Sequence, residues 1–475
     1  MAKKHLQVPA WLLAVGMSVT LVGGGLIGYY AHGLRDSAVG VSSANLPAGF
    51  DKVLSTYATI ENNYYKSTSS KKLANGAIKG MVNSLGDQFS TYLTNDSKSS
   101  LDSTLSASFG GIGATVQQGD NKLTIEGVMA NTPAKKAGMK TGDVLIAVNG
   151  KNVAKDDVNT AVEKIRGKIG TTVKVTVKRD GKTMTFSMKR AKITTDTVEG
   201  SMSKTNKTIG IITMDTFSDP TSKQFESTVK KLRKQGAKSF VLDLRGNPGG
   251  ELTQALAIAS MCLKNGQTIV KVQDRTGAVQ TYKAGKKYDK GFKVTEPMAI
   301  LIDGNSASAS EILSAALNEN NKTPLVGEQS FGKGTVQNVA SMSSSAELKL
   351  TVAKWLTPNG TWINKKGLTP TIKVKYPDYM NITAFSVTSM KLGDESGDVK
   401  SLQQLLKALG NDPKTENGYY GPSTQAAVKA FQSDHGLTAD GTANTATLQA
   451  LVAELSTKYA NDDPQLNAAV KALTK

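Results

Sequence analysis

Histidine and cysteine are nearly missing from this chain of 475 residues, which has three histidines and one cysteine. The histidines are His5, His32 and His435, so none lies in the large middle part of the sequence. A serine–histidine–aspartate triad and a histidine-rich zinc site are therefore excluded from that part. The lone thiol of Cys262 cannot form an intrachain disulfide and is typical of a small core residue. We expect no metal and no cofactor.

Acidic residues are outnumbered, with 39 acidic against 58 basic side chains and a net charge of +19. The basic residues are spread along the chain and are not interleaved with aromatics, which argues against a nucleic-acid partner. Attraction to an anionic cell envelope explains the balance more simply, and a generally basic solvated surface explains it equally well. With 39% hydrophobic residues and only 13 prolines, the composition is that of a folded globular chain.

Charge is absent from a long segment near the N-terminus, Gln7–Leu34. Within it, the mostly apolar stretch 11–30 is long enough to cross a bilayer as a helix. Lys3 and Lys4 precede it, which places the N-terminal tail in the cytoplasm. The alternative is a cleavable signal peptide, but its apolar core is usually about 7–15 residues, and no Ala-x-Ala site follows here. We therefore expect residues 1–35 to be a cytoplasmic tail and transmembrane anchor.

The remaining chain changes its periodicity several times, which predicts a multidomain protein. Apolar residues at helical spacing are followed by short alternating strands with glycine turns, and then by alternating strands and helices of an α/β core. In the second of these parts we expect a strand at Lys122–Val128 and one clear helix at Val158–Ile165. The serine-rich segment 95–106 favours a linker. The expected parts are a linker at 36–49, an N-terminal helical region at 50–100, a β-rich domain at 105–190, an α/β core at 191–376, a linker at 377–390, a small all-α domain at 391–455 and a charged tail at 456–475.

Two turns in the α/β region follow buried strands. Gly246–Gly250 reads Gly-Asn-Pro-Gly-Gly, and its glycines let a ligand approach backbone N–H groups closely. The alternative is a tight turn without a ligand. The second turn carries Ser306, Ser308 and Ser310 at the start of a predicted helix, where the helix dipole favours a nucleophile. Serine is also a common helix cap, and capping alone explains one or two of them.

A third segment places Lys333 between two glycines. The spacing Gly327–Lys333 mimics a phosphate-binding loop, but Gly334 stands where the magnesium-binding hydroxyl is required. Nucleotide binding is therefore disfavoured. A lysine acts as a general base only when desolvation or repulsion lowers its pKa from about 10.4 to about 7–8. A dry, glycine-lined site supplies such desolvation.

Together these three segments resemble the carboxyl-terminal processing proteases, also called tail-specific proteases, which are serine endopeptidases with a Ser–Lys dyad. The resemblance spans roughly residues 50–376. It implies that Ser308 is the nucleophile, that Lys333 is the general base and that Gln337 orients the lysine. The choice of Ser308 over its neighbouring serines rests on the family spacing.

The same resemblance implies an oxyanion hole. Its donors would be the N–H of Ala309 and that of Gly249 or Gly250. It also suggests that helices within residues 50–93 exchange between protomers of a homodimer.

The β-rich domain resembles a PDZ domain, which binds the C-terminus of a peptide as an added strand. The residues that carry the likeness are Phe109–Ala114, Asn131–Ala134, Gly142–Leu145 and Val148–Gly150. The carboxylate-binding loop would consist of Gly111, Ile112, Gly113 and Ala114. Arg166 is either a gating residue that contacts the protease body when the domain swings, or a solvated turn residue.

Residues 391–455 resemble a three-helix peptidoglycan-binding domain, on Gly397–Val399, Gly418–Pro422 and the residues around Phe431. Tyr419, Tyr420 and Phe431 either contact the wall polymer or only pack.

The whole chain is thus expected to be a membrane-anchored serine endopeptidase near the cell wall. It would cleave extracytoplasmic proteins selected or gated through their free C-terminus. The competing hypothesis is a non-catalytic scaffold that uses only its PDZ and wall-binding domains. A third hypothesis, a cell-wall hydrolase, is disfavoured because this sequence lacks the histidine-rich or paired-carboxylate site that such chemistry usually needs.

Overall fold

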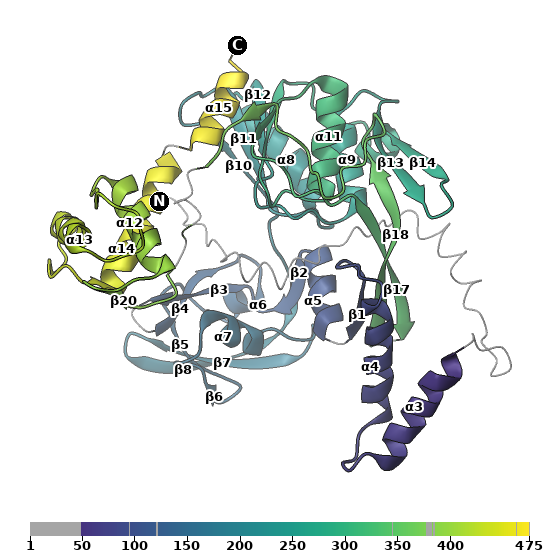
Figure 1. Cartoon of the computed structure of the whole chain (residues 1–475), viewed down its shortest axis with the longest axis horizontal. Helices are drawn as coiled ribbons and strands as arrows, with labels where there is room; N and C mark the ends of the chain where they lie inside the picture. The colour runs from purple at the N-terminus through teal and green to yellow at the C-terminus, as the bar shows by residue number, and fades with distance from the viewer. Residues whose placement is uncertain are drawn as a thin grey trace.

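The computed structural model describes residues 49–94, 96–119, 122–343, 345–376, 382, 385–461 and 463–474. The predicted membrane anchor at residues 11–30 lies outside these ranges. Within them, none of the helices combines the length and the apolar character that a membrane crossing requires. The described residues form an N-terminal helical arm, a β-rich domain, an α/β core and a C-terminal helical domain (Figure 1).

A six-stranded sheet forms the centre of the α/β core. Its order is β10-β11-β12-β15-β16-β19, with only the β10–β11 pair antiparallel. The central strands are continuous apolar runs because a parallel sheet is covered on both faces. Their bounds are β10 Val198–Met202, β11 Ile209–Met214, β12 Ser239–Asp243, β15 Met298–Ile302, β16 Leu325–Gly327 and β19 Ile372–Lys373.

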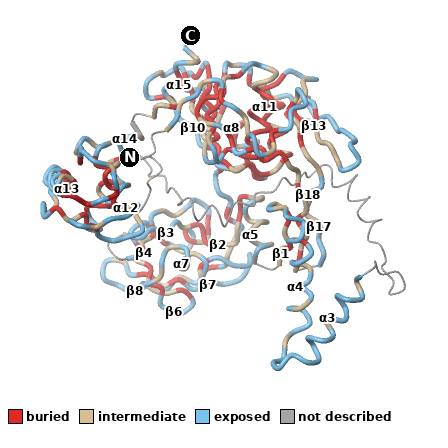
Figure 2. The backbone as a smooth tube through the Cα atoms, viewed as in Figure 1, coloured by how far each residue is buried: buried red, intermediate tan, exposed pale blue. Residues whose placement is uncertain are grey.

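Different helices cover the two faces of this sheet. Phe240 and Leu242 point into the main core, which is shared with α8 (Thr221–Lys234), α9 (Leu252–Cys262) and α11 (Ala309–Asn321). Val241, between them, packs on the other face against α15 (Pro464–Ala472). The segment expected to be a charged tail at 456–475 thus includes a helix that buries this face. Figure 2 shows α15 beside the buried strands.

A second sheet joins the core to the N-terminal region. Its long central strand β18 (Ala346–Leu356) pairs with β17 (Thr335–Ser343), β13 (Thr268–Asp274) and β1 (Thr91–Thr94). The remaining strand β14 (Val279–Lys283) pairs with β13, and the short helix α10 (Lys286–Asp289) follows. Through β1, a segment far away in the sequence becomes part of this second sheet.

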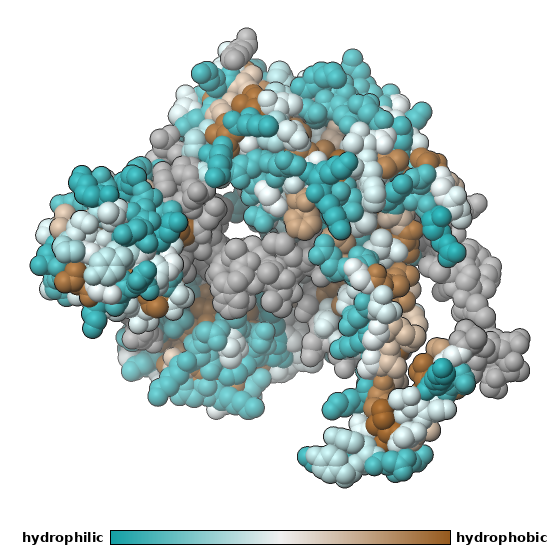
Figure 3. Space-filling view, in the orientation of Figure 1, coloured by the Kyte–Doolittle hydropathy of each residue, from teal (hydrophilic) through white to brown (hydrophobic). Residues whose placement is uncertain are grey.

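The N-terminal arm consists of α3 (Phe50–Asn63) and α4 (Ser70–Asn83), which project from the body (Figure 1). Helix α3 buries none of its residues, and apolar side chains remain exposed along the arm (Figure 3). The segment expected to be a linker at 95–106 instead contains helix α5 (Asp96–Leu105). Contacts with the core hold the end of α5, since Ser218 Oγ donates to the carbonyl of Thr104 at 2.7 Å.

The β-rich domain is a sheet of order β3-β4-β5-β7-β8, in which β3 is an edge strand. Strands β2 and β9 pair where the chain enters and leaves the domain. Helix α7 matches the helix expected in this part of the chain. The bounds are β2 Ser108–Gly111, β3 Ala114–Gly119, β4 Lys122–Val128, α6 Pro133–Lys136, β5 Val144–Val148, β6 Lys151–Asn152, α7 Val158–Ile165, β7 Thr172–Arg179, β8 Lys182–Lys189 and β9 Ala191–Thr194.

The C-terminal domain packs three helices around one apolar core that contains Tyr420 and Phe431. The third helix continues to Asn461, beyond the boundary expected at residue 455. The bounds are β20 Ser389–Met390, α12 Gly397–Leu409, α13 Pro422–Asp434, β21 Ala443–Asn444 and α14 Thr445–Asn461.

Candidate active site

Ser308 begins helix α11 in an unusual backbone conformation. Its φ is 58° and its ψ is −112°, in a region that non-glycine residues rarely adopt, and the residue is fully buried. Such strain persists only where surrounding contacts impose it, and it is typical of functional sites. Among the residues that the structure describes, none forms a hydrogen bond with the Oγ atom of Ser308. The hydroxyl is therefore available for chemistry, although it is buried.

The two neighbouring serines have structural bonds. Ser306 Oγ donates to the carbonyl of Leu244 at 2.8 Å, and Ser310 Oγ donates to the carbonyl of Asn247 at 2.9 Å. Both bonds join the serine turn to the glycine turn that follows β12. Ser306 and Ser310 thus hold the two turns together, and Ser308 lies between them without such a bond.

The glycine turn lies directly against Ser308. A Cβ on Gly249 would lie 2.9 Å from the Cβ of Ser308 and 2.7 Å from the carbonyl oxygen of Ala307. The N–H of Gly249 already donates to Asn247 Oδ1 at 2.9 Å. Among the hydrogen bonds of the described residues, none uses the N–H of Gly250 or of Ala309. These two amides are the open donors beside Ser308.

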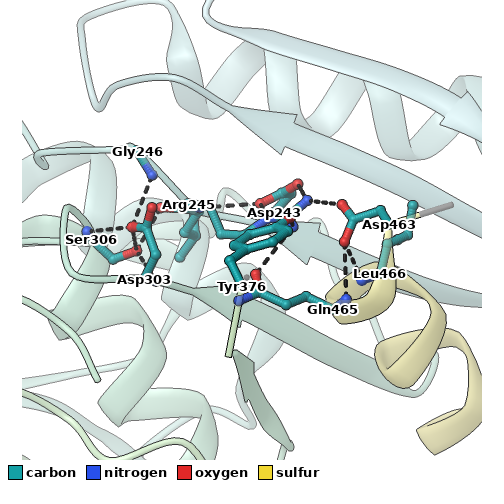
Figure 4. Close-up of polar contacts among 10 residues, drawn as sticks. Asp243, Arg245, Gly246, Asp303, Ser306, Tyr376, Asp463, Gln465 and Leu466 are labelled. Atoms are coloured by element: carbon teal, nitrogen blue, oxygen red, sulfur yellow. Dashed lines mark hydrogen bonds and ion pairs between the residues drawn. The ribbon is translucent and has the colours of Figure 1, made fainter. Parts of the chain in front are cut away.

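Arg245 anchors the start of the glycine turn (Figure 4). Its guanidinium forms ion pairs with Asp243 at 2.5 Å and with Asp463 at 2.8 Å, and it also donates to Tyr376 and Gln465. Asp463 and Gln465 belong to the start of α15, so the last helix of the chain reaches the base of the turn. Asp243 lies at the end of β12, just before the turn. None of these four partners of Arg245 belongs to the serine turn, so they hold Arg245 independently of it.

Glu311 connects the serine turn to the lysine segment. It is buried on α11, and its Oε2 accepts the N–H of Ser308 at 2.8 Å and the N–H of Lys333 at 2.9 Å. Its Oε1 accepts from Ser330 Oγ at 2.5 Å and from the N–H of Gly332 at 2.7 Å. Burial raises the pKa of this carboxyl, and the hydrogen bonds oppose that shift. One side chain thus sets the relative position of two backbone segments.

Lys333 is 3% exposed, and its Nζ lies 4.8 Å from the ring centre of Phe89. The indole N–H of Trp355 donates to its carbonyl at 2.7 Å. Burial, and next the positive charge of Lys349, lower the pKa of Lys333 to about 7, while the carboxylates of Glu311 and Asp87 act in the opposite direction. A substantial fraction of the amine is thus neutral near pH 7.

Gln337 lies on β17, buried near this lysine segment. Its Nε2 donates to Thr335 Oγ1 at 2.9 Å and to Thr351 Oγ1 at 3.0 Å. Its Oε1 accepts no hydrogen bond from any described residue, Lys333 included. The two threonines fix the carboxamide, and they were not anticipated from the sequence.

The expected carboxylate loop of the β-rich domain lies at the start of the edge strand β3. The carbonyl of Ile112 accepts from Ala134, and that of Gly113 accepts from Met129 at 2.9 Å. Gly113 has φ +78°, and a Cβ there would lie 2.3 Å from Thr132. Among the described strands β3 pairs only with β4, so its other edge has no strand partner, as strand addition by a peptide requires.

Arg166 ends helix α7, and its guanidinium stacks 4.0 Å from the ring centre of Phe109 on β2. It therefore contacts the two-stranded β2–β9 connection between the β-rich domain and the core. Among the described residues, no group of three or more histidine, cysteine, aspartate or glutamate side chains is arranged to hold a metal ion.

Comparison with known proteins identifies the core first. Residues 208–374 match the family model of peptidase family S41. The chain is 41% identical over 444 residues to the carboxy-terminal processing protease CtpA of Bacillus subtilis, covering 93% of this chain and 94% of the relative. It is 38% identical over 429 residues to the processing protease CtpB of the same organism, with 89% and 88% covered. This chain belongs to peptidase family S41.

The other parts of this S41 peptidase also match known domains. Residues 110–189 match a PDZ domain, 395–451 a peptidoglycan binding domain and 31–97 the N-terminal domain of the activating protease CtpB. Among solved structures, the photosystem II D1 C-terminal processing protease is similar, with 23% identity, a TM-score of 0.42 and coverage of 70% of this chain and 95% of that one. The family resemblance seen in the sequence is confirmed, and the chain is a serine-type C-terminal processing peptidase.

The peptidoglycan-binding domain of this S41 peptidase separates its aromatic residues into two groups. Tyr420 and Phe431 are fully buried, and the Tyr420 hydroxyl donates to the carbonyl of Gly441 at 2.9 Å. Tyr419 is 45% exposed. Of the three, only Tyr419 lies at the surface, so Tyr420 and Phe431 are core residues of this domain.

Proposed function

We propose that this S41 peptidase cleaves extracytoplasmic polypeptides with Ser308 as nucleophile and Lys333 as general base. The observation that carries the proposal is the buried, strained Ser308, whose backbone N–H shares Glu311 Oε2 with that of a buried lysine of lowered pKa. A scaffold without catalysis has no use for this combination, because burying an amine and straining a backbone both cost stability.

The chemistry follows from these groups. Ser308 Oγ attacks the peptide carbonyl carbon while Lys333 Nζ takes the hydroxyl proton. The oxyanion is stabilised by the N–H groups of Ala309 and Gly250, since that of Gly249 is already bonded to Asn247. Lys333 then returns the proton to the leaving amine, and it later activates the water that hydrolyses the acyl-enzyme. Gln337 would orient the lysine when its free Oε1 accepts from Nζ.

The test is cleavage of an unstructured peptide by purified variants. Ser308→Ala and Lys333→Ala should each abolish turnover and leave the thermal unfolding curve cooperative. Ser314→Ala is the matched control, because Ser314 lies on the same helix and its buried hydroxyl also lacks a hydrogen-bond partner within the described part of the chain. Full activity in Lys333→Ala would refute the dyad.

The PDZ domain would select or gate substrates through their free C-terminus. The N–H groups of Gly111, Ile112, Gly113 and Ala114 are the proposed carboxylate binders. Arg166 would couple the position of the PDZ domain to the activity of the core, because its partner Phe109 lies in the connection between that domain and the core. Arg166→Ala should alter the activity on protein substrates more than that on short peptides; equal changes would contradict the gating role.

The location is proposed to be the outer face of the cell membrane, close to the wall. Residues 11–30 would anchor the chain, and the peptidoglycan-binding domain would hold it at the wall. Membrane fractions washed with alkaline carbonate should retain the full chain and lose a variant that lacks residues 1–35. Recovery of the protein in the wash, whether its N-terminus is intact or cleaved, would contradict an anchor.

A further inference from the structure

A second buried lysine lies in the site. Lys349 is 1% exposed on β18, where it pairs with Val339 on β17 and with Thr91 on β1. A lysine is almost never fully buried unless its surroundings require it. Lys349 and Thr351 lie on the same face of β18, because side chains alternate along a strand. The Thr351 hydroxyl on that face accepts a hydrogen bond from the side chain of Gln337.

A segment from the N-terminal region closes the same site. Asp87, in the turn before β1, accepts from Ser90 Oγ at 2.6 Å and from the N–H of Phe89 at 3.1 Å, and it hydrogen-bonds the Thr351 hydroxyl. The buried Ser90 Oγ also accepts the N–H of Thr351 at 3.0 Å. The turn is thus tied to β18 and carries Phe89, whose ring faces the Lys333 amine.

Three charged side chains, from three different elements, act electrostatically on Lys333. They are Lys349 on β18, Asp87 in the turn before β1 and Glu311 on α11. Glu311 accepts four hydrogen bonds from the serine turn and the lysine segment, so it holds these two backbone segments together. Lys349 and Asp87 have no part in the proposed chemistry, and their charges are opposite.

We propose that Lys349 and Asp87 are positioning residues that set the protonation of the general base, Lys349 by favouring the neutral amine and Asp87 by favouring the charged one. The proposal rests on the proposed role of Lys333 as the base. Repulsion between two buried ammonium groups disfavours the second proton, and a carboxylate at the edge of the pair limits that effect. The pKa of Lys349 is itself lowered to about 8 by burial, so it stays mostly protonated near pH 7. The N-terminal region thereby takes part in the catalytic electrostatics of the core.

The test is the pH dependence of kcat/KM for a short fluorogenic peptide, measured from pH 5 to pH 10. Lys349→Met removes the charge at similar volume and should move the acid limb to higher pH by roughly one unit, with the plateau value retained. Asp87→Asn should move the limb to lower pH. Lys354→Met is the control: it lies on the same strand, with its amine 5.2 Å from the ring centre of Trp362, and should leave the limb in place.

A Lys349→Met profile that superimposes on that of the wild type would overturn the proposal, and so would an equal shift in Lys354→Met. If Lys349→Met does not fold, Asp87→Asn decides, and an unchanged or upward-shifted limb overturns the proposal. These results are separable from failure of the dyad. A wrong dyad leaves Lys333→Ala active, whereas a wrong electrostatic role leaves Lys333→Ala inactive and the profiles unshifted.

Discussion

Substitution of Gly249 by alanine tests how closely the glycine turn must approach the serine. The glycine has φ +99°, and an added Cβ would lie 2.9 Å from Ser308 Cβ, 2.9 Å from the Ala309 nitrogen and 2.7 Å from the Ala307 oxygen. Carbon atoms prefer separations of about 3.5–4.0 Å, so the turn must retreat by roughly 0.6 Å or more. Two of the three neighbours are backbone atoms, which cannot rotate away.

The expected cost has two parts. The left-handed backbone costs an alanine about 1–2 kcal/mol, and the forced contact adds about 1–3 kcal/mol of overpacking. A retreat of this size exceeds the ~0.5 Å within which catalytic groups must be held. Because it displaces the amide of the adjacent Gly250, we expect kcat to fall by about 10²–10³, as for the loss of one oxyanion-hole donor.

Gly246→Ala is the matched control for this substitution. Gly246 belongs to the same turn and has φ +70°, but an added Cβ meets nothing within 4 Å. Its variant should lose only the backbone part of the stability and keep most of its activity. Peptide hydrolysis and thermal unfolding of both variants give the comparison. An active Gly249→Ala enzyme, or an equally inactive Gly246→Ala enzyme, would refute the reasoning.

Three further outcomes follow from the same structure. Lys333→Met should raise the free energy of unfolding by roughly 4 kcal/mol below pH 7, and this gain should vanish toward pH 10.4. The reason is that the pKa of Lys333 is about 7 in the folded protein and lies below that of the unfolded chain. A change in unfolding free energy that does not depend on pH would contradict this. The wild type should cleave peptides with an amidated C-terminus more slowly than peptides with a free one. Gly113→Ala should cleave both at the same rate, because its Cβ would clash with Thr132 in the carboxylate loop. Equal rates in the wild type would contradict recognition of the C-terminus by the PDZ domain. Leu54→Asp, on the exposed α3, should convert a homodimer to a monomer in light scattering, whereas a wild-type monomer would contradict arm exchange.

Local sequence patterns predicted much of the chain correctly. Helix α7 was expected at Val158–Ile165 and strand β4 at Lys122–Val128, and the structure has both with those bounds. Periodicity succeeded there because each element packs on a single nearby core. The serine-rich segment at 95–106 was expected to be a linker, but bonds from Ser218 and Asp219 hold the end of a helix. Those bonds join residues far apart in the sequence, so the local composition carries no trace of them.

The histidine count alone excluded the commonest serine-protease mechanism from the middle of the chain, because a residue that is absent cannot act as a base. The family motifs in turn selected Ser308, Lys333 and Gln337 as candidates. Only the tertiary structure decided which groups surround them. Glu311 was visible beside Ser310 in the sequence, but nothing there shows that it binds two distant backbones. Lys349 looks like any lysine of a half-exposed strand, and Asp87 like any turn residue. Their effect on Lys333 arises because β1 crosses to β18 and water is excluded, and both conditions are properties of packing.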